Sequence, residues 1–89
     1  MTDRDDAYSE VAWAQLDELA VGPHFDLYNA VLDACALVLE VPDRMRKHST
    51  SVTTGEGVVL SLPVTGYGPY KVFWSTSGPR IEAVFPYER

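Results

Sequence analysis

The sequence contains one cysteine, Cys35, among its 89 residues. A single cysteine excludes a disulfide within the chain and a zinc site built from several thiolates. Long apolar runs are also missing, since the longest, residues 34–39, has six residues and a membrane-spanning helix needs about 20. The first six residues are mostly acidic or polar, unlike the apolar stretch of a secretion signal. We therefore expect a cytoplasmic protein with no membrane segment.

Basic residues are scarce and unevenly distributed. The chain holds 7 Lys and Arg against 13 Asp and Glu, which gives a net charge of −6. Residues 1–43 carry ten of the acids and one base, whereas residues 44–89 carry six bases and three acids. Cellular salt screens charge over about 8 Å, so two faces of a small domain act as nearly independent surfaces. The acidic total argues against nucleic-acid binding, but the basic second half remains a candidate surface for a charged partner.

Sequence signals for a bound cofactor are absent as well. The chain has no metal-ligand spacing, no glycine-rich phosphate loop and no Ser/His/Asp arrangement. We therefore expect no metal and no cofactor. Apolar residues make up 46% of the chain and charged residues 22%, which is a globular composition. A chain of 89 residues is long enough for one core, so residues 1–89 are predicted to form a single domain.

Two segments in the first half have the apolar spacing of helices. The first, residues 9–20, has Ser9 as its predicted N-cap and ends at Gly22-Pro23. The second, residues 24–40, ends at Val41-Pro42, because the residue before proline is driven out of helical geometry. The apolar arc of this second helix consists of Phe25, Tyr28, Val31, Leu32, Cys35, Val38 and Leu39.

The pattern changes after these helices. Residues 43–57 have the composition of a loop. Three β-branched and aromatic segments then predict strands: residues 58–64, 70–76 and 81–85. Strict alternation would place Ile81, Ala83 and Phe85 on one face of the last strand. The order predicts an α+β fold, in which a helical hairpin packs on a small antiparallel sheet. The large side chains predicted for the core, with the thiol, are Trp13, Tyr28, Cys35, Phe73 and Trp74.

The order of six short segments carries a family resemblance. They are residues 8–12, 15–19, 32–42, 70–74, 80–85 and 87–89. Residues 70–74, Tyr-Lys-Val-Phe-Trp, are similar to a Tyr-Arg-Val-x-Tyr strand, with lysine in place of arginine. Together the segments resemble the RelE/ParE superfamily of type II toxin–antitoxin toxins. The resemblance implies the order β-α-α-β-β-β, with a first strand from residues 4–8, although Arg-Asp-Asp-Ala-Tyr is a poor strand sequence.

The resemblance also implies a function. Many RelE-like toxins cleave messenger RNA in the ribosomal decoding site, where a ribose 2′-hydroxyl attacks the adjacent phosphate. The reaction needs a proton acceptor, cations for the charge that develops on the phosphoryl oxygens and a proton donor for the leaving oxygen. The expected partners are a cognate antitoxin, the ribosome and messenger RNA. The residues expected to act in catalysis are Lys71, Arg80, Tyr87 and Arg89.

A basic cluster in the middle of the chain is the second candidate. It consists of Arg44, Arg46, Lys47 and His48, and we expect it to hold the phosphate backbone of RNA. His48 can also act as an acid or base near neutral pH. His24, at a predicted helix start, is expected to be structural.

The same residues have simpler interpretations. Lys71 is then a solvated strand lysine, Arg80 a solubilising turn residue, and Tyr87 and Arg89 an exposed chain end. The basic cluster is then a solvated loop or a surface that pairs with acids of an antitoxin. Ribosome-dependent nucleases of the family are usually strongly basic, and this chain is acidic.

Three other functions fit the sequence. A ParE-like toxin acts on gyrase, and a protein-binding module on the same fold needs no catalysis. An acidic inhibitor would imitate nucleic acid with one stripe of the second helix, made of Asp26, Asp33 and Glu40. A homodimer is compatible with each, because a chain this short gains stability from a partner.

Overall fold

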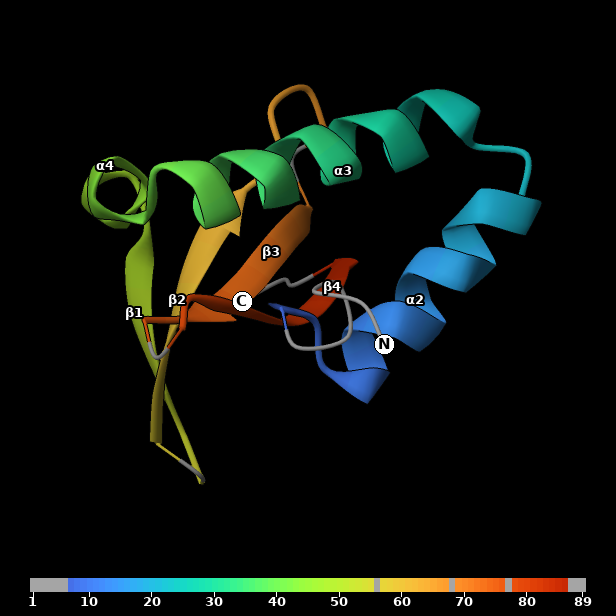
Figure 1. The fold of residues 1–89 in the computed structure, drawn as a ribbon. Coiled ribbons are helices and arrows are strands. Elements are labelled where there is room, and N and C mark those ends of the chain that lie inside the picture. The colour runs from blue at the N-terminus through green and yellow to red at the C-terminus, as the bar shows by residue number, and fades with distance from the viewer. Residues whose placement is uncertain (1–6, 56, 68, 77, 87–89) are drawn as a thin grey trace.

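The computed structural model describes residues 7–55, 57–67, 69–76 and 78–86, without the side chain of Pro86. Three helices precede four strands: α2 (Glu10–Val21), α3 (Phe25–Glu40), α4 (Pro42–Lys47), β1 (Thr50–Thr54), β2 (Gly57–Pro63), β3 (Tyr70–Ser75) and β4 (Arg80–Pro86). The strands form one antiparallel sheet in the order β1-β2-β3-β4. In Figure 1, α3 crosses one face of this sheet and α2 lies beside β4. The expected α+β class is confirmed.

Local signals place the two long helices close to their predicted bounds. Ser9 caps α2, because its hydroxyl oxygen accepts a hydrogen bond of 3.0 Å from the Ala12 N–H. Gly22 ends α2, with its N–H bonded to the Leu19 carbonyl. Val41 ends α3 directly before Pro42, as expected.

The core lies between the helices and one face of the sheet. The predicted apolar arc of α3 is largely confirmed, since Val31, Cys35 and Val38 are completely buried. They belong to a cluster that includes Trp74 of β3. Phe25 is the exception, because 67% of its surface is exposed. It begins α3 at the end that extends past the sheet in Figure 1, so no strand covers it.

The predicted loop of residues 43–57 is wrong. It contains α4 and β1 instead, and β1 pairs in full register with β2. Pro42 starts α4, because its fixed φ suits the first helical position, and the buried Met45 anchors the helix on the core. Ser49 then links both elements to the sheet: its hydroxyl donates to the Met45 carbonyl (2.8 Å) and accepts from Trp74 Nε1–H (3.1 Å).

The predicted alternation in β4 is also wrong. Trp74 pairs with Ile81 and Phe73 pairs with Ala83, so Glu82 is an extra residue that forms a β-bulge. The bulge reverses the alternation after Ile81. Ile81 therefore faces the helices, as does Val84, while Ala83 lies on the other face of the sheet with Phe73. The sequence alone does not distinguish Ala83 and Phe73 from residues of the core.

The expected first strand is replaced by a single contact. Among the described residues before α2, Tyr8 forms one isolated parallel bridge with Ile81. Residues 4–6 of the predicted strand lie outside the described residues. Within the described ranges the order is therefore helices followed by four strands, not β-α-α-β-β-β. None of the helices described is long and apolar enough to cross a membrane.

Candidate functional site

The sheet has one face that no described helix covers. The strand registers and the alternation of side chains along each strand show which residues lie on this face, away from α3. We call it the open face, and it carries Thr50, Val52, Val59, Ser61, Pro63, Lys71, Phe73, Ser75, Arg80, Ala83 and Phe85. Phe73 was expected in the core and is indeed buried, but on this face, where its ring stacks on Phe85 at 4.7 Å between centroids.

Lys71 and Arg80, two of the predicted catalytic residues, both lie on the open face. Lys71 pairs with Phe85, and Arg80 pairs with Ser75. Lys71 and Ser75, the partner of Arg80, are four positions apart on β3, which corresponds to about 13 Å along the strand. The two cations can therefore hold different phosphates of one extended RNA strand, but their backbones are too far apart to serve one phosphate together.

The open face is hollowed near both cations. A depression of about 800 Å³ lies at the Arg80 end, and its lining includes Phe73, Ser75, Glu82 and Phe85. A second depression, of about 610 Å³, lies at the Lys71 end and is lined by residues 50–53 of β1 together with Ser61, Pro63 and Lys71. The first therefore offers charged and aromatic groups, and the second offers the hydroxyls of Thr50 and Ser61 on the face that carries the half-buried Lys71.

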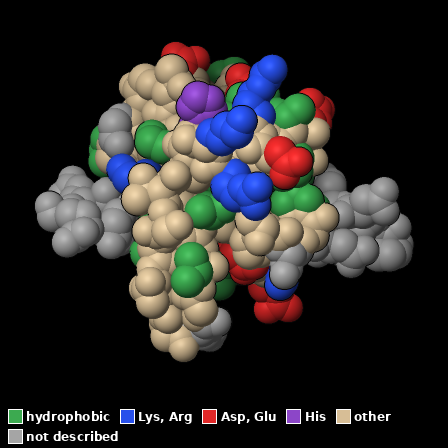
Figure 2. Space-filling view, turned by 90° about the vertical axis from the view of Figure 1, so that its left-hand side faces the viewer, with side chains coloured by type: hydrophobic (Ala, Val, Ile, Leu, Met, Phe, Trp, Pro, Cys, Tyr) green, Lys and Arg blue, Asp and Glu red, His purple; other side chains and the backbone are tan. Residues whose placement is uncertain are grey.

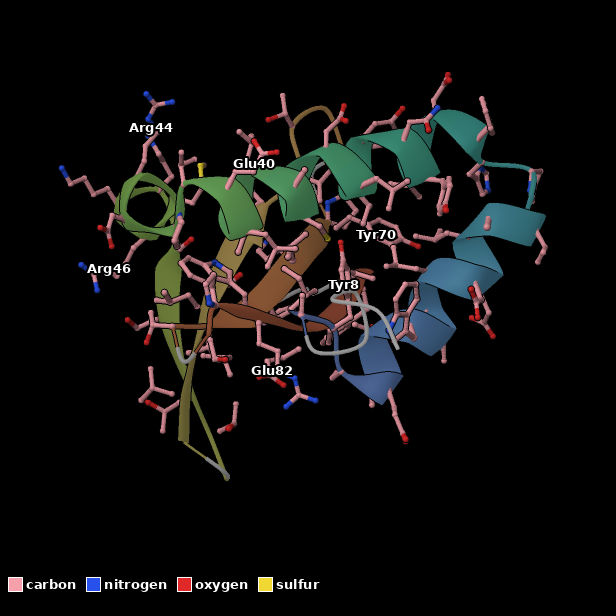
Figure 3. All side chains as sticks on the ribbon, viewed as in Figure 1. Tyr8, Glu40, Arg44, Arg46, Tyr70 and Glu82 are labelled. Atoms are coloured by element: carbon pink, nitrogen blue, oxygen red, sulfur yellow. The ribbon has the colours of Figure 1, made fainter. Side chains whose placement is uncertain are left out.

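Glu82 is a site residue that sequence reasoning missed. Its Oε2 accepts a hydrogen bond of 3.0 Å from the Ser75 hydroxyl, in the same depression that Arg80 lines. Figure 3 shows Glu82 on the side of the sheet away from α3. The bulge brings this carboxylate to the open face, and the sequence contains no signal that predicts the bulge. A carboxylate beside a cation can accept a proton, and it also repels phosphate.

The predicted RNA-binding cluster occupies a different part of the molecule. Arg44, Arg46 and Lys47 belong to α4, His48 follows it, and all four residues are exposed. Figure 2 views the α4 end of the molecule and shows Lys, Arg and His side chains gathered there. In Figure 3, Arg44 and Arg46 extend away from the body of the protein in different directions. The structure thus separates this cluster from the open face.

The other candidate residues and the one thiol of the chain lie away from the open face or outside the described residues. Tyr87 and Arg89 lie outside the described residues. His24 precedes α3 at the N-cap position but makes no side-chain cap there. Burial raises the pKa of the Cys35 thiol to about 12, against the opposing effect of a hydrogen bond with Tyr8, so this thiol is no nucleophile. In the part of the chain that is described, no three His, Cys, Asp or Glu side chains are grouped to hold a metal.

Comparisons with known proteins add no constraint. No protein-family model, no curated protein and no solved structure matches the chain. The geometry of the open face and the resemblance of the sequence segments are therefore the observations that bear on function.

Proposed function

We propose that the chain is a RelE-like toxin of a type II toxin–antitoxin system, which inhibits translation by cleaving messenger RNA at the ribosome. The observation that supports it is the shared placement of Lys71 and Arg80 on the open face, beside the carboxylate of Glu82. A catalytic surface for an extended RNA strand needs cations spaced along it and a proton acceptor between or beside them. The open face provides both.

In the proposed reaction, Glu82 takes the proton of a ribose 2′-hydroxyl. The 2′-oxygen then forms a bond to the adjacent phosphorus, and the bond from phosphorus to the 5′-oxygen of the next nucleotide breaks. The leaving 5′-oxygen takes up a proton from water, and a 2′,3′-cyclic phosphate remains on the upstream fragment. Arg80 lies near Glu82 and stabilises the charge on the phosphoryl oxygens. Lys71 holds a neighbouring phosphate as a point charge, because it lacks the fork of arginine.

Two features of the protein limit this activity. Glu82 lowers the affinity of the depression for phosphate, and the chain as a whole is acidic. We therefore assign part of the affinity to the basic cluster Arg44, Arg46, Lys47 and His48, which reaches a separate stretch of ribosomal or messenger RNA. Its contribution falls as salt rises, since each phosphate contact releases counterions.

Expression in a bacterial host tests the proposal. We expect growth arrest, which a cognate antitoxin relieves, and cleaved messenger RNA on purified programmed ribosomes. Arg80→Ala and Glu82→Gln should each lower the cleavage rate by about 100-fold or more, the usual loss for an acid–base or charge-stabilising group. Lys71→Ala should weaken RNA binding, and Lys71→Arg should strengthen it.

Glu40→Gln is the matched control for Glu82→Gln. Glu40 is an exposed carboxylate at the end of α3, away from the open face, and its loss should leave cleavage unchanged. Arrest that persists in the Lys71, Arg80 and Glu82 variants would reject the assigned site. A chain that neither arrests growth nor cleaves RNA on ribosomes would overturn the proposed function.

A protein-binding module on the same surface is the second candidate. The observation in its favour is the apolar part of the Arg80 depression, whose lining includes Val11, Val52, Val59 and Phe85. A protein partner would cover these side chains better than a phosphate backbone would. This candidate predicts that expression causes no arrest and that Phe85→Ala abolishes capture of a partner whereas Lys71→Ala does not.

A further inference from the structure

The two edges of the sheet are treated differently. The outer edge of β4 is covered: the Ser9 N–H donates to the Ile81 carbonyl (2.9 Å), and the Ser9 hydroxyl donates to the Glu82 carbonyl. Gln15 of α2 completes the cover, because its Oε1 accepts a hydrogen bond of 2.6 Å from the Val84 N–H. β1 forms the opposite edge, and among the described residues no segment pairs with its outer side.

The backbone groups that β1 presents can be assigned from the sheet. The Val64 N–H donates to the Tyr70 carbonyl at 3.0 Å, so the even-numbered residues of β2 bond toward β3 and the odd-numbered residues toward β1. Their partners on β1 are Thr50, Val52 and Thr54. Ser51 and Thr53 therefore direct their N–H and C=O groups outward, away from the sheet.

The sequence of β1 does nothing to block pairing. Natural proteins protect an edge with charges, proline or a bulge, whereas β1 reads Thr-Ser-Val-Thr-Thr and pairs with β2 without a register shift. Four of its five residues are exposed, and Val and Thr favour extended structure. In Figure 1 the β1–β2 hairpin projects beyond the helices, which leaves its outer side accessible.

We propose that β1 is the dimer interface of this protein and that it pairs with β1 of a second copy, antiparallel, about a two-fold axis at Val52. In this register the backbone of Ser51 pairs with that of Thr53 of the second copy, and the backbone of Thr53 pairs with that of Ser51 of the second copy. Each pair exchanges two N–H···O=C bonds, so the interface has four backbone hydrogen bonds. Val52 lies opposite Val52 of the second copy in a non-hydrogen-bonded pair, at a Cα separation of about 4.5 Å. The two open faces then form one continuous surface.

Charge permits β1 to pair with a second copy of itself and favours the antiparallel register over the parallel one. β1 itself is uncharged, so its pairing brings no like charges together. The basic helix α4 leads into the Thr50 end of β1. In the antiparallel register the two Thr50 residues lie about 13 Å apart along the strands, on opposite sides of the axis, and the α4 helices lie beyond them. That separation exceeds the screening length of about 8 Å, whereas a parallel pair would bring both basic clusters side by side.

The contact is small. Five residues from each copy make an interface at the low end of specific protein contacts, so we expect a dissociation constant on the order of 10⁻⁴ M. Dimerisation is independent of the proposed cleavage chemistry, because no residue assigned to catalysis contributes to the β1 edge.

Disulfide trapping tests the interface. Val52→Cys should form a covalent dimer under mild oxidation, because its pair geometry lies within the range that a disulfide accepts. Cys35 does not interfere, since it is completely buried. Val58→Cys is the control: Val58 is 61% exposed on β2 but lies away from the axis, so we expect trapping at least about tenfold slower. Ser51→Cys should also trap slowly, because its partner is Thr53 rather than Ser51.

Sedimentation of the unmodified chain gives an independent readout. We expect its apparent mass to rise toward that of a dimer as the concentration approaches millimolar, and Val52→Lys to remain monomeric with an unchanged circular dichroism spectrum. Equal trapping rates for the Val52→Cys and Val58→Cys variants would overturn the proposal. A monomer throughout the concentration series would overturn it too, even if β1 accepted a strand of another protein.

Discussion

At the scale of single residues, burial decides what the chemically reactive groups can do. Cys35 sits completely buried in the core, and its thiol is held neutral. Glu82 has a less reactive side chain but reaches the open face, because one extra residue in β4 turns it there. Composition identifies both groups, and only their surroundings distinguish a packing residue from a candidate base.

The thiol pKa predicts a pH dependence of stability. Its value rises from 9.0 to about 12 in the folded protein, so the folded state holds this proton more tightly than the unfolded state. The stabilising contribution is therefore present below pH 9 and is lost as the pH rises from 9 toward 12, with a slope of up to about 1.4 kcal/mol per pH unit. Measured by urea denaturation, the cost of Cys35→Ala should shrink over this range. A cost that stays constant across it would contradict the buried, neutral thiol.

At the scale of elements, short links hold the second half of the protein together. Ser49 stands between α4 and β1 and bonds at once to Met45 and to Trp74. Because Trp74 is completely buried in β3, this link fixes where β1 begins relative to the rest of the sheet. The Ser49 hydroxyl thus helps to position the start of the candidate dimer edge, which pairs with β2 along its whole length.

A double-mutant cycle measures that link. Ser49→Ala should lower the free energy of unfolding by about 1–2 kcal/mol, because the buried Trp74 Nε1–H then lacks its acceptor. In a Trp74→Phe background the same Ser49→Ala change should cost less, since no N–H is left unsatisfied. Thermal or chemical denaturation of the four proteins gives the coupling. Equal costs in both backgrounds would mean that the hydrogen bond contributes nothing to stability.

The elements also show which features a sequence predicts. α2 and α3 were predictable because Ser9, Gly22 and Pro42 mark their ends and their apolar spacing is regular. β1 was not, because its serine and threonine content matches a loop as well as an exposed edge strand, and only pairing with β2 distinguishes them. A short helix with one apolar anchor, such as α4 with Met45, gives too little periodicity to detect.

The candidate site was predictable in part for a related reason. Lys71 is a cation of a predicted strand and Arg80 directly precedes the last predicted strand, and antiparallel pairing of these strands places both on one sheet. Their shared face depends on the bulge at Glu82, since uninterrupted alternation would have changed the face of one end of β4. A bulge depends on tertiary packing and has no residue type of its own.

At the scale of the whole molecule, most of the described acids lie on α2 and α3, whereas the described Lys and Arg residues lie on α4 and on the open face, with Asp43 and Glu82 as the acids among them. The exposed acids Asp26, Asp33 and Glu40 lie along α3, and the cations lie on α4 and on the open face. A helix layer is about 10 Å thick, which exceeds the screening length in cellular salt, so the two surfaces interact weakly. The total charge therefore says little about what the open face binds.

Neutralising the acidic stripe tests this separation. The triple variant Asp26→Asn, Asp33→Asn and Glu40→Gln should arrest growth as the unmodified protein does, with less than about a twofold change in RNA affinity at cellular salt. A filter-binding titration at two salt concentrations provides the measurement. If instead the variant loses its biological effect while Lys71→Ala and Arg80→Ala retain theirs, the acidic helix is the functional surface and the chain imitates nucleic acid.

The cover that Ser9 and Gln15 place over β4 has a consequence for assembly. A sheet with two unpaired edge strands can add one copy after another and grow into a fibril. Within the described residues the chain itself covers the β4 edge, so pairing at the other edge uses the outward backbone groups of β1 in both molecules. Growth stops at two.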